Sequence, residues 1–275
     1  MKRFVLSAAP GPEGIIRIYE KDYHYLVHVR RLRSGMCFEA ILPGEVETQV
    51  RILSTRDNIL IGECLKGVEK HPTPLPPIAL FQSLPKGSKM DLIVRQAAEE
   101  GVSIVAPFES ENSVVRLVKN PAEDAQGESF SPQKIKRWER IAREGRQQSG
   151  SALKTEIHAP CRLAALFKYW ESIKKEFKLP LGILLHQEPL EKGTFHGYLG
   201  NNPDFVALAV GPEGGFSPGE VSLFLAAGFK PLLMGSTILR TETAALCGVA
   251  AIRIILLERE TWTSCPTGSC SSKSP

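Results

Sequence analysis

Short apolar runs alternate with helical stretches between residues 78 and 257. Most of these runs lack the alternation of apolar and polar residues that marks a strand with one face in water. Continuous apolar strands separated by helices are typical of a parallel sheet covered on both faces. The pattern therefore predicts an α/β fold with a mostly parallel sheet. Strands are expected over Ile78–Phe81, Ile104–Ala106, Ile183–His186, Phe205–Val210 and Pro231–Met234, and helices over Lys89–Glu100, Lys134–Gln148, Leu163–Lys175, Pro218–Ala227 and Glu242–Leu257.

A proline-rich segment separates this part from a different N-terminal pattern. Residues 70–77 contain four prolines, which favours a stiff, extended connector. The segments before it are short and β-rich, with one expected helix at Lys21–Val29, and this pattern is typical of a small barrel. We expect an N-terminal barrel over residues 1–70, a linker over 71–77, a second domain over 78–260 and a disordered tail over 261–275. The expected N-terminal strands are Phe4–Leu6, Gly14–Ile18, Cys37–Leu42, Glu47–Leu53 and Ile59–Leu65.

The composition is that of a globular protein. Of the 275 residues, 43% are hydrophobic and 23% are charged, which is close to the average for folded domains. No apolar run approaches the length that spans a bilayer, and the first ten residues are too weakly apolar for a secretory signal. We therefore expect a cytoplasmic protein without a membrane segment. The six cysteines include no C-x-x-C pair, so reduced thiols and no metal site are expected.

Basic residues gather in two places, although the net charge is only +4. Arg30, Arg31 and Arg33 form one cluster. Seven basic and two acidic residues lie between residues 133 and 154. Such patches can follow a phosphate backbone, although a solvated face is the simpler interpretation of each patch taken alone.

Residues 211–215, Gly-Pro-Glu-Gly-Gly, form a loop between an expected strand and an expected helix. Ser217 to Glu220 fit a capping box with proline at the first helical position, which fixes the helix start. Glycines let a backbone approach a ligand closely, but this spacing is neither that of a P-loop nor that of a Rossmann fingerprint. The G-x-S-x-G pattern at 215–219 is not a nucleophile elbow, because Pro218 has no N–H for an oxyanion hole. The pattern supports a ligand-binding loop or a tight turn.

Two further loops follow expected strands. In one, residues 235–245, Arg240 stands directly before a helix start, with Thr241 as the expected N-cap. A cation is unfavourable at a helix N-terminus, so Arg240 indicates either a bound anion or a salt bridge. The other loop comprises residues 184–188. Because α/β sheets bind ligands at the carboxyl ends of their strands, the three loops predict one ligand site.

Several of these segments together resemble the RsmE family of SPOUT-class RNA methyltransferases. Residues 210–220, VGPEGGFSPGE, and 233–245, LMGSTILRTETAA, are similar in order and spacing to the family's cofactor loops. Residues 28–40 are similar to its N-terminal RNA-binding domain, and residues 84–115 to its first helix and strand. The resemblance implies a trefoil-knotted, parallel-sheet methyltransferase domain after a PUA-like β-barrel. It also implies S-adenosylmethionine as cofactor, a homodimer through the knot domain, and methylation of N3 of a uridine in 16S ribosomal RNA, free or in the small ribosomal subunit.

The resemblance also assigns site residues. RNA contacts are expected from basic side chains, which are Arg3, Arg30, Arg31, Arg33, Lys86, Arg95, Arg143 and Arg146. Cofactor contacts are expected from the three loops, at Leu185, His186, Glu188, Val210, Gly211, Pro212, Glu213, Gly214, Gly215, Met234, Gly235, Ile238, Leu239, Arg240 and Thr241.

The nucleophile of the implied reaction must be activated. Uracil N3 carries a proton and is a poor nucleophile until it loses that proton, so the enzyme must favour the uracil anion with a base or a nearby positive charge. Arg240 is the expected catalytic cation. Glu188 and Glu213 are candidate proton acceptors, but Glu213 could equally bind the amino group of the cofactor. No residue stands out as the base, and positioning of the two substrates could supply much of the rate.

The sequence also departs from the family pattern at three polar positions. Gln96, Asn112 and Ser151 stand where the family has a lysine or an arginine, which alters three contacts expected with RNA. Two other functions stay open. One is a SPOUT methyltransferase that acts on another RNA site or atom, and the other is a non-catalytic RNA-binding factor.

Overall fold

The computed structural model describes residues 3–43, 46–65, 75–117, 132–151, 153–188 and 193–259. The chain divides into two compact units. The expected tail lies outside the described residues, as do residues 71–74 of the expected linker. Within the described ranges the four cysteines are free thiols, and no helix is long and apolar enough to cross a membrane. The first unit takes residues 1–72, 94–103 and 136–156, and the second takes residues 73–93, 104–135 and 157–275.

The first unit contains a five-stranded sheet with the order β1-β3-β4-β5-β2. The β1–β3 pair is parallel and the other pairs are antiparallel. Buried Phe4, Ile16, Phe38 and Val50 belong to its apolar core. The Val5 amide also donates to Oε1 of Gln147 at 2.7 Å, which ties the first strand to a helix that comes much later in the chain. The strands are β1 (Phe4–Val5), β2 (Ile15–Ile18), β3 (Cys37–Leu42), β4 (Val46–Arg56) and β5 (Ile59–Leu65).

The helix predicted over Lys21–Val29 is confirmed, but most of it is wound as a π-helix. A short α-helix, α1 (Glu20–Tyr23), continues into a six-residue π-helix, η1 (His24–Val29). Apolar periodicity does not distinguish the wider winding of a π-helix from that of an α-helix. The rings of His24 and His28 lie 5.1 Å apart, and the Tyr23 ring packs edge-on against His28. The i, i+4 spacing of the two histidines therefore serves ring packing.

The second sheet has seven strands, ordered β12-β10-β11-β6-β7-β8, with β9 paired to β7. Parallel pairing joins β12, β10, β11, β6 and β7 in turn, and β9 also runs parallel to β7. Every residue of β6 and β11 is buried, which confirms the prediction of a covered parallel sheet. The strands are β6 (Ile78–Ser83), β7 (Ile104–Glu109), β8 (Glu156–Ile157), β9 (Cys161–Arg162), β10 (Pro180–Leu185), β11 (Phe205–Val210) and β12 (Lys230–Leu232).

The five helices predicted after residue 78 are confirmed, each to within two residues at either end. The structure adds α5, which has five residues and is capped by the Thr194 hydroxyl; so short a helix has no apolar period to detect.

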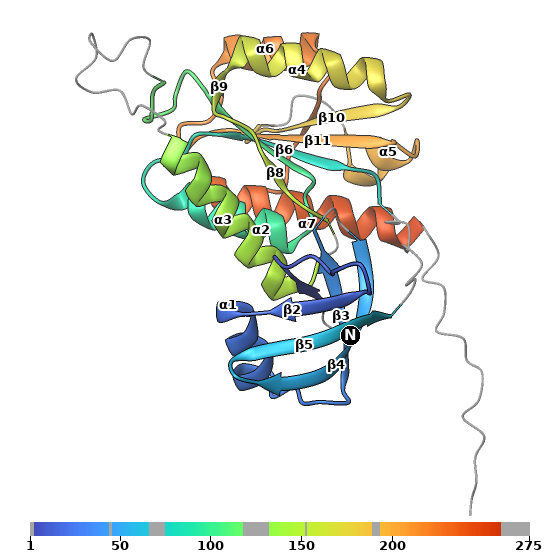
Figure 1. The fold of residues 1–275 in the computed structure, drawn as a ribbon. Coiled ribbons are helices and arrows are strands. Elements are labelled where there is room, and N and C mark those ends of the chain that lie inside the picture. The colour runs from blue at the N-terminus through green and yellow to red at the C-terminus, as the bar shows by residue number, and fades with distance from the viewer. Residues whose placement is uncertain are drawn as a thin grey trace, which may run out of the picture. The chain divides into compact units, whose positions relative to one another are not determined.

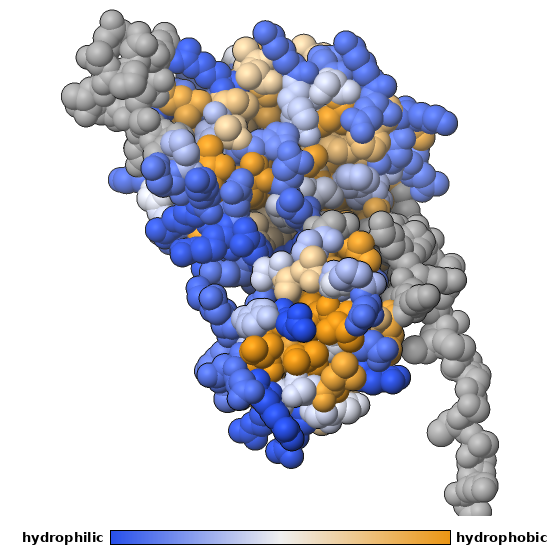
Figure 2. All heavy atoms as spheres, viewed as in Figure 1, coloured by the Kyte–Doolittle hydropathy of each residue, from blue (hydrophilic) through white to orange (hydrophobic). Residues whose placement is uncertain are grey.

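In the second unit, α4 and α6 cover one face of the sheet and α7 the other (Figure 1). Hydrophilic side chains gather over α3 (Figure 2). The helices are α2 (Lys89–Glu99), α3 (Pro132–Ser149), α4 (Leu163–Glu176), α5 (Phe195–Leu199), α6 (Pro218–Ala226) and α7 (Thr241–Arg259).

Aromatic residues fill the core between the second sheet and helices α4 and α6. The rings of Trp170 and Phe229 lie 4.9 Å apart, and those of Phe224 and Phe229 lie 5.0 Å apart. The Trp170 indole N–H donates to the Ala227 carbonyl at 3.0 Å, which satisfies a buried polar group at the end of α6. Such packing gives the loops at the strand ends a rigid base.

Candidate functional site

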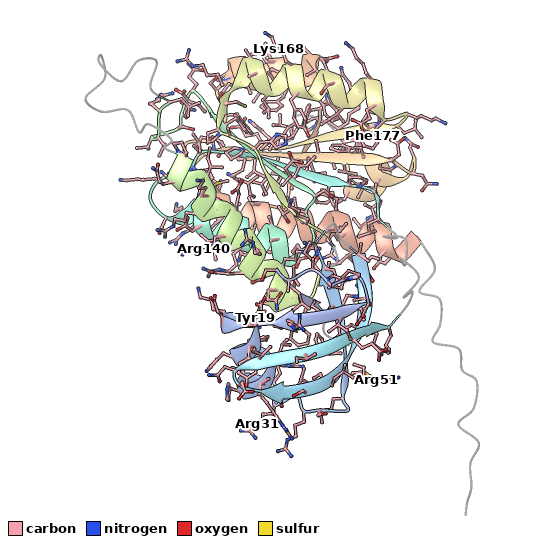
Figure 3. All side chains as sticks on the ribbon, viewed as in Figure 1. Tyr19, Arg31, Arg51, Arg140, Lys168 and Phe177 are labelled. Atoms are coloured by element: carbon pink, nitrogen blue, oxygen red, sulfur yellow. The ribbon has the colours of Figure 1, made fainter. Side chains whose placement is uncertain are left out.

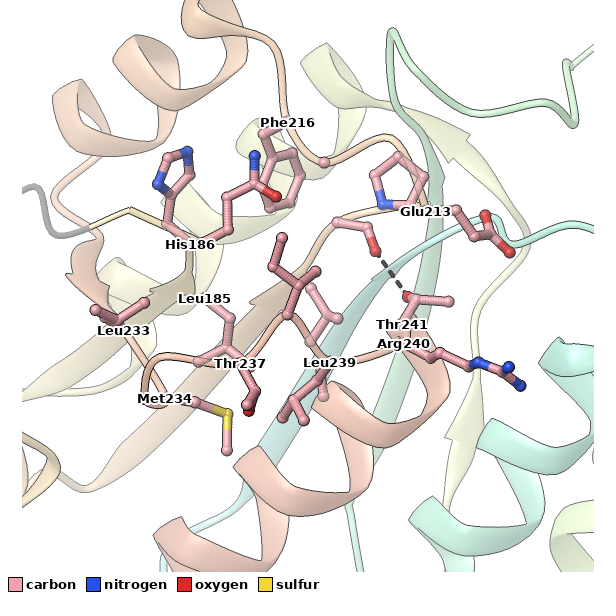
Figure 4. Close-up of a pocket in the computed structure, with 18 residues that line it drawn as sticks. Leu185, His186, Glu213, Phe216, Leu233, Met234, Thr237, Leu239, Arg240 and Thr241 are labelled. Carbon is pink, nitrogen blue, oxygen red and sulfur yellow. Dashed lines mark hydrogen bonds between the residues drawn. The ribbon is translucent and has the colours of Figure 1, made fainter.

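Three loops at the carboxyl ends of β10, β11 and β12 enclose a cavity of about 260 Å³ (Figure 4). These strands are neighbours in the parallel sheet, so their ends meet at one edge. The structure thus brings the three predicted loops together around one space. Most residues expected to bind a cofactor line it, namely Leu185, His186, Val210, Gly211, Pro212, Glu213, Gly215, Met234, Gly235, Ile238, Leu239, Arg240 and Thr241.

Two of the expected residues do not line the cavity. Gly214 packs against Asn112 instead, and Glu188 is exposed, with its backbone N–H donating to Nδ1 of His186 at 3.1 Å. Sequence reasoning missed other lining residues, although a signal existed for Ala244, which stands four residues after Arg240 on the same side of the helix. The missed lining residues are Gln187, Phe216, Leu233, Thr237 and Ala244.

A hydrogen-bond chain fixes the backbone where the 211–215 loop begins. Gln82, fully buried on β6, donates through Nε2 to Oγ1 of Thr241 at 2.9 Å. The Thr241 hydroxyl in turn donates to the Gly211 carbonyl at 2.7 Å (Figure 4). The prediction of Thr241 as the N-cap is wrong, because the Ala244 N–H bonds to the Arg240 carbonyl and places Arg240 at the cap. The threonine hydroxyl instead holds the loop.

The predicted capping box at the start of α6 is confirmed, and it extends beyond the helix. The Ser217 side chain accepts from the Glu220 amide, and the Glu220 carboxylate accepts from the Ser217 amide at 3.0 Å. The same carboxylate also accepts from the Ser110 hydroxyl at 2.9 Å and from the Glu111 amide at 2.8 Å. Glu220 is only 6% exposed. It therefore joins the end of the 211–217 segment to the loop after β7.

Asn112, in the loop after β7, contacts the glycine-rich segment from outside the cavity. Its side-chain Nδ2 donates to the Gly215 carbonyl at 3.1 Å and approaches the Gly214 carbonyl at 3.4 Å. Gly215 has φ +69°, a left-handed conformation that favours glycine, and its amide closes a turn onto the Pro212 carbonyl. A Cβ added at Gly214 would lie 3.1 Å from the Asn112 Cβ. The backbone conformation thus favours glycine at 215, and a side chain at 214 would be in tight contact with Asn112.

Glu213 on the cavity wall is paired with Lys89. The Lys89 Nζ lies 2.6 Å from a Glu213 carboxylate oxygen and 3.6 Å from one of Glu242. Burial raises the pKa of the Glu213 carboxyl, but hydrogen bonds from Lys89, its own amide and the Lys86 amide outweigh burial and hold this pKa below its ordinary value. The hydrogen bond to Glu213 likewise raises the pKa of the Lys89 ammonium. Glu213 is therefore a stable anion at neutral pH.

Arg240 projects at the same end of the cavity as Glu213 (Figure 4). Its side chain is exposed, and no carboxylate among the described residues forms an ion pair with it. The salt-bridge explanation left open by the sequence therefore finds no support in the described ranges. A ligand that binds at this rim would therefore meet a guanidinium that no described carboxylate already occupies.

The residues expected to contact RNA differ in how available they are. Arg31 and Arg33 are exposed, and Arg31 projects from the first unit into solvent (Figure 3). Arg30 is exposed and lies 5.7 Å above the Phe4 ring. Arg3 is half-buried between the carboxylates of Glu39 and Glu47, so part of its charge is already compensated.

The remaining expected contacts lie on or near the helices. Arg95 and Arg143 are exposed, and Lys86 is exposed in the loop before α2. Arg146 is only 5% exposed, and its Nε donates to the Ser151 carbonyl at 3.1 Å. A buried guanidinium has little surface to offer a phosphate, so the burial of Arg146 argues against the RNA contact expected there.

Comparison with known proteins identifies the family of this chain. A family model of an RNA methyltransferase domain matches residues 71–253. The ribosomal RNA small subunit methyltransferase E of Aquifex aeolicus is 35% identical over 188 residues, which cover 67% of this chain and 72% of the relative. The enzyme of the same name from Synechocystis is 28% identical over 257 residues, which cover 92% of this chain and 78% of the relative.

A solved structure shares the fold. It is a ribosomal RNA small subunit methyltransferase E from Neisseria gonorrhoeae bound to S-adenosyl methionine. It aligns with a TM-score of 0.66 over 93% of this chain and 98% of the other, at 22% identity. The chain therefore belongs to the RNA methyltransferase family, among the ribosomal RNA small subunit methyltransferases E.

Proposed function

We propose that this chain transfers a methyl group from S-adenosylmethionine to N3 of a uridine in 16S ribosomal RNA. The observation that carries the proposal is the cavity at the ends of β10, β11 and β12, with Arg240 at its rim and no described carboxylate paired with it. Membership in a family of RNA methyltransferases fixes the reaction class. The ribosomal target rests on the names of the relatives, and it implies action in the cytoplasm on free RNA or on the assembled small subunit.

The cavity suits S-adenosylmethionine. Apolar side chains of Leu185, Val210 and Leu239 line it, as adenine requires, and the glycine-rich loop lets backbone groups approach a ligand. The carboxylate of Glu213 lies on the wall, where it would face the positive charges of the cofactor. When bound, the cofactor supplies an electrophilic methyl group on sulfonium. We assign its binding to the lining residues of the three loops.

Arg240 is proposed to stabilise the developing uracil anion. A fixed positive charge beside N3 and the adjacent carbonyl oxygens lowers the free energy of the deprotonated base. The planar guanidinium presents a fork of N–H donors, which can face N3 and a neighbouring oxygen at once. Its position at the N-cap of α7 places it at the rim.

The two candidate proton acceptors differ in their suitability. A general base works best when its pKa lies near the operating pH. Glu213 fails this condition, because Lys89 and two amides hold the pKa of its carboxyl below the ordinary value. We therefore assign Glu213 to cofactor binding. Glu188 is exposed beside His186 and outside the cavity lining, and it stays the proposed proton acceptor.

Two finer features of the fold belong to the same proposal. We assign the first unit's five-stranded sheet to a PUA-like RNA-binding barrel, and the 234–240 loop with α7 to a trefoil knot. The exposed Arg30, Arg31 and Arg33 would then contact RNA phosphates from the first unit, and Lys86, Arg95 and Arg143 would add further contacts.

A homodimer through the knot domain is proposed from exposed apolar side chains at the site. Ile238 on the cavity wall is 82% exposed, and Leu233 is 39% exposed. Large apolar residues beside a binding site are typical of surfaces that a second protein covers. We expect light scattering to show a dimer for the wild type and a shift toward monomer for Ile238→Asp. Leu53→Asp, at an exposed apolar residue of the first unit, should stay dimeric. A monomeric wild type at micromolar concentration would refute this proposal.

The test of function is methyl transfer from labelled S-adenosylmethionine to small ribosomal subunits that lack the modification. Nucleoside mass spectrometry then identifies the product. We expect 3-methyluridine. Cofactor binding without product would favour another RNA site, and failure to bind the cofactor would favour a non-catalytic RNA-binding factor.

A further inference from the structure

The loop after β7 holds the glycine-rich loop of the cavity from its outer side. Asn112 donates to the Gly215 carbonyl and approaches that of Gly214, while Glu220 binds the amides of Ser217 and Glu111. The segment from Gly214 to Ser217 is thus held at two points. None of these contacts lies on the cavity side, because neither Asn112 nor Glu220 is among the lining residues.

We propose that Asn112 is a positioning residue for the cofactor loop rather than a contact for RNA. This inference rests on the proposed use of S-adenosylmethionine. The position is one where the family resemblance implies arginine, and a side chain exposed beside the active site would ordinarily be assigned to phosphate binding. The two glycine carbonyls give its amide a different and specific partner.

The hydrogen bond from Asn112 to the Gly215 carbonyl also affects the direction of the next backbone amide, that of Phe216. The carbonyl of one residue and the N–H of the next point in opposite directions across a trans peptide, and the described residues contain no cis peptide. With the Gly215 carbonyl turned to Asn112, the Phe216 N–H points to the opposite side of the loop. Gly215 and Phe216 both line the cavity. Asn112 therefore keeps this amide available to a ligand and lowers the entropy that the loop loses on binding.

Glu220 supports this arrangement from the buried side. Its carboxylate accepts from Ser110 and from the Glu111 amide, the residues directly before Asn112. Ser113, directly after it, is 3% exposed and pairs with the buried Ser83 hydroxyl at 2.9 Å. Asn112 thus stands between two anchored neighbours. A loop fixed in this way can hold one side chain at a defined position.

The test is Asn112→Asp, which keeps the size of the side chain but removes the donor and sets a carboxylate against two carbonyls. We expect the Kd for S-adenosylmethionine, measured by calorimetry, to rise about three- to fivefold or more, the usual effect of one lost hydrogen bond. The KM for the cofactor should rise with it, while kcat and the Kd for ribosomal RNA change less than about twofold. Asn112→Ser, which keeps a donor on a shorter side chain, should recover part of the affinity.

The matched control is Glu111→Gln. It removes a charge from the same loop, but only the Glu111 backbone, not its side chain, bonds to Glu220. We expect it to bind the cofactor as the wild type does. An unchanged cofactor Kd in Asn112→Asp, with weaker RNA binding, would overturn the inference and leave the proposed function intact. A wild type that binds no cofactor would overturn both.

Discussion

Replacement of Arg240 by alanine is expected to lower the rate of methyl transfer by about a hundred- to a thousandfold. Removal of one group that stabilises a developing anion in an active site has an effect of this size. Most of the loss should appear in kcat, because the guanidinium is proposed to act on the uracil anion rather than on ground-state binding. Single-turnover methylation of small subunits lacking the modification, quantified by nucleoside mass spectrometry, measures the effect.

Stability should change little in this variant. Arg240 is exposed and has no ion pair among the described residues, and such substitutions usually alter the free energy of unfolding by less than about 0.5 kcal/mol. Arg162→Ala is the matched control, because Arg162 is an exposed arginine of the same unit that lies outside the cavity lining. Equal rates of methyl transfer in Arg240→Ala and Arg162→Ala would show that Arg240 has no role in catalysis.

Arg240→Lys separates the charge of the side chain from its shape. Lysine keeps the positive charge but loses the planar fork that can bind two acceptors at once. If charge alone favours the uracil anion, this variant should recover most of the rate lost in Arg240→Ala. If the fork must engage both N3 and a neighbouring oxygen, its rate should stay near that of the alanine variant.

Local patterns allowed much of the fold to be predicted. The runs Ile78–Phe81 in β6 and Phe205–Val210 in β11 are apolar at every position because both faces of the sheet are buried, and this leaves a clear signal. The capping box at Ser217 depends only on residues three apart. The π-helix at His24–Val29 and the five-residue α5 leave no such signal, since one mimics α-helical spacing and the other is too short.

The part of the site that could be predicted is the part that follows from the order of strands and loops along the chain. Loops at the carboxyl ends of parallel strands lie at one edge of the sheet, so the sequence alone could place the Gly211 and Arg240 segments together. The contacts that hold them could not be predicted, because Asn112 lies 103 residues before Gly215 and Ser110 lies 110 residues before Glu220. The role of Thr241 was misjudged for the same reason: its partner, Gly211, is distant in sequence.

Glu220→Gln is expected to lower the free energy of unfolding by about 2–4 kcal/mol, since hydrogen bonds to a buried charged group contribute about 1.5–3 kcal/mol each and an unmatched donor adds to the loss. In the wild type, Oε2 accepts from Ser110 and Ser217 and Oε1 accepts from the Glu111 amide. A glutamine has only one oxygen, so its NH₂ group must face one of these backbone donors.

Chemical denaturation measures the loss from Glu220→Gln. Glu111→Gln is again the control, because it makes the same chemical change at an exposed side chain and keeps the Glu111 backbone amide that bonds to Glu220. The control should change the free energy of unfolding by less than about 0.5 kcal/mol. Equal stability of the two variants would mean that the Glu220 carboxylate does not hold the loop after β7. The loop would then lack the buried anchor on which the positioning of Asn112 depends.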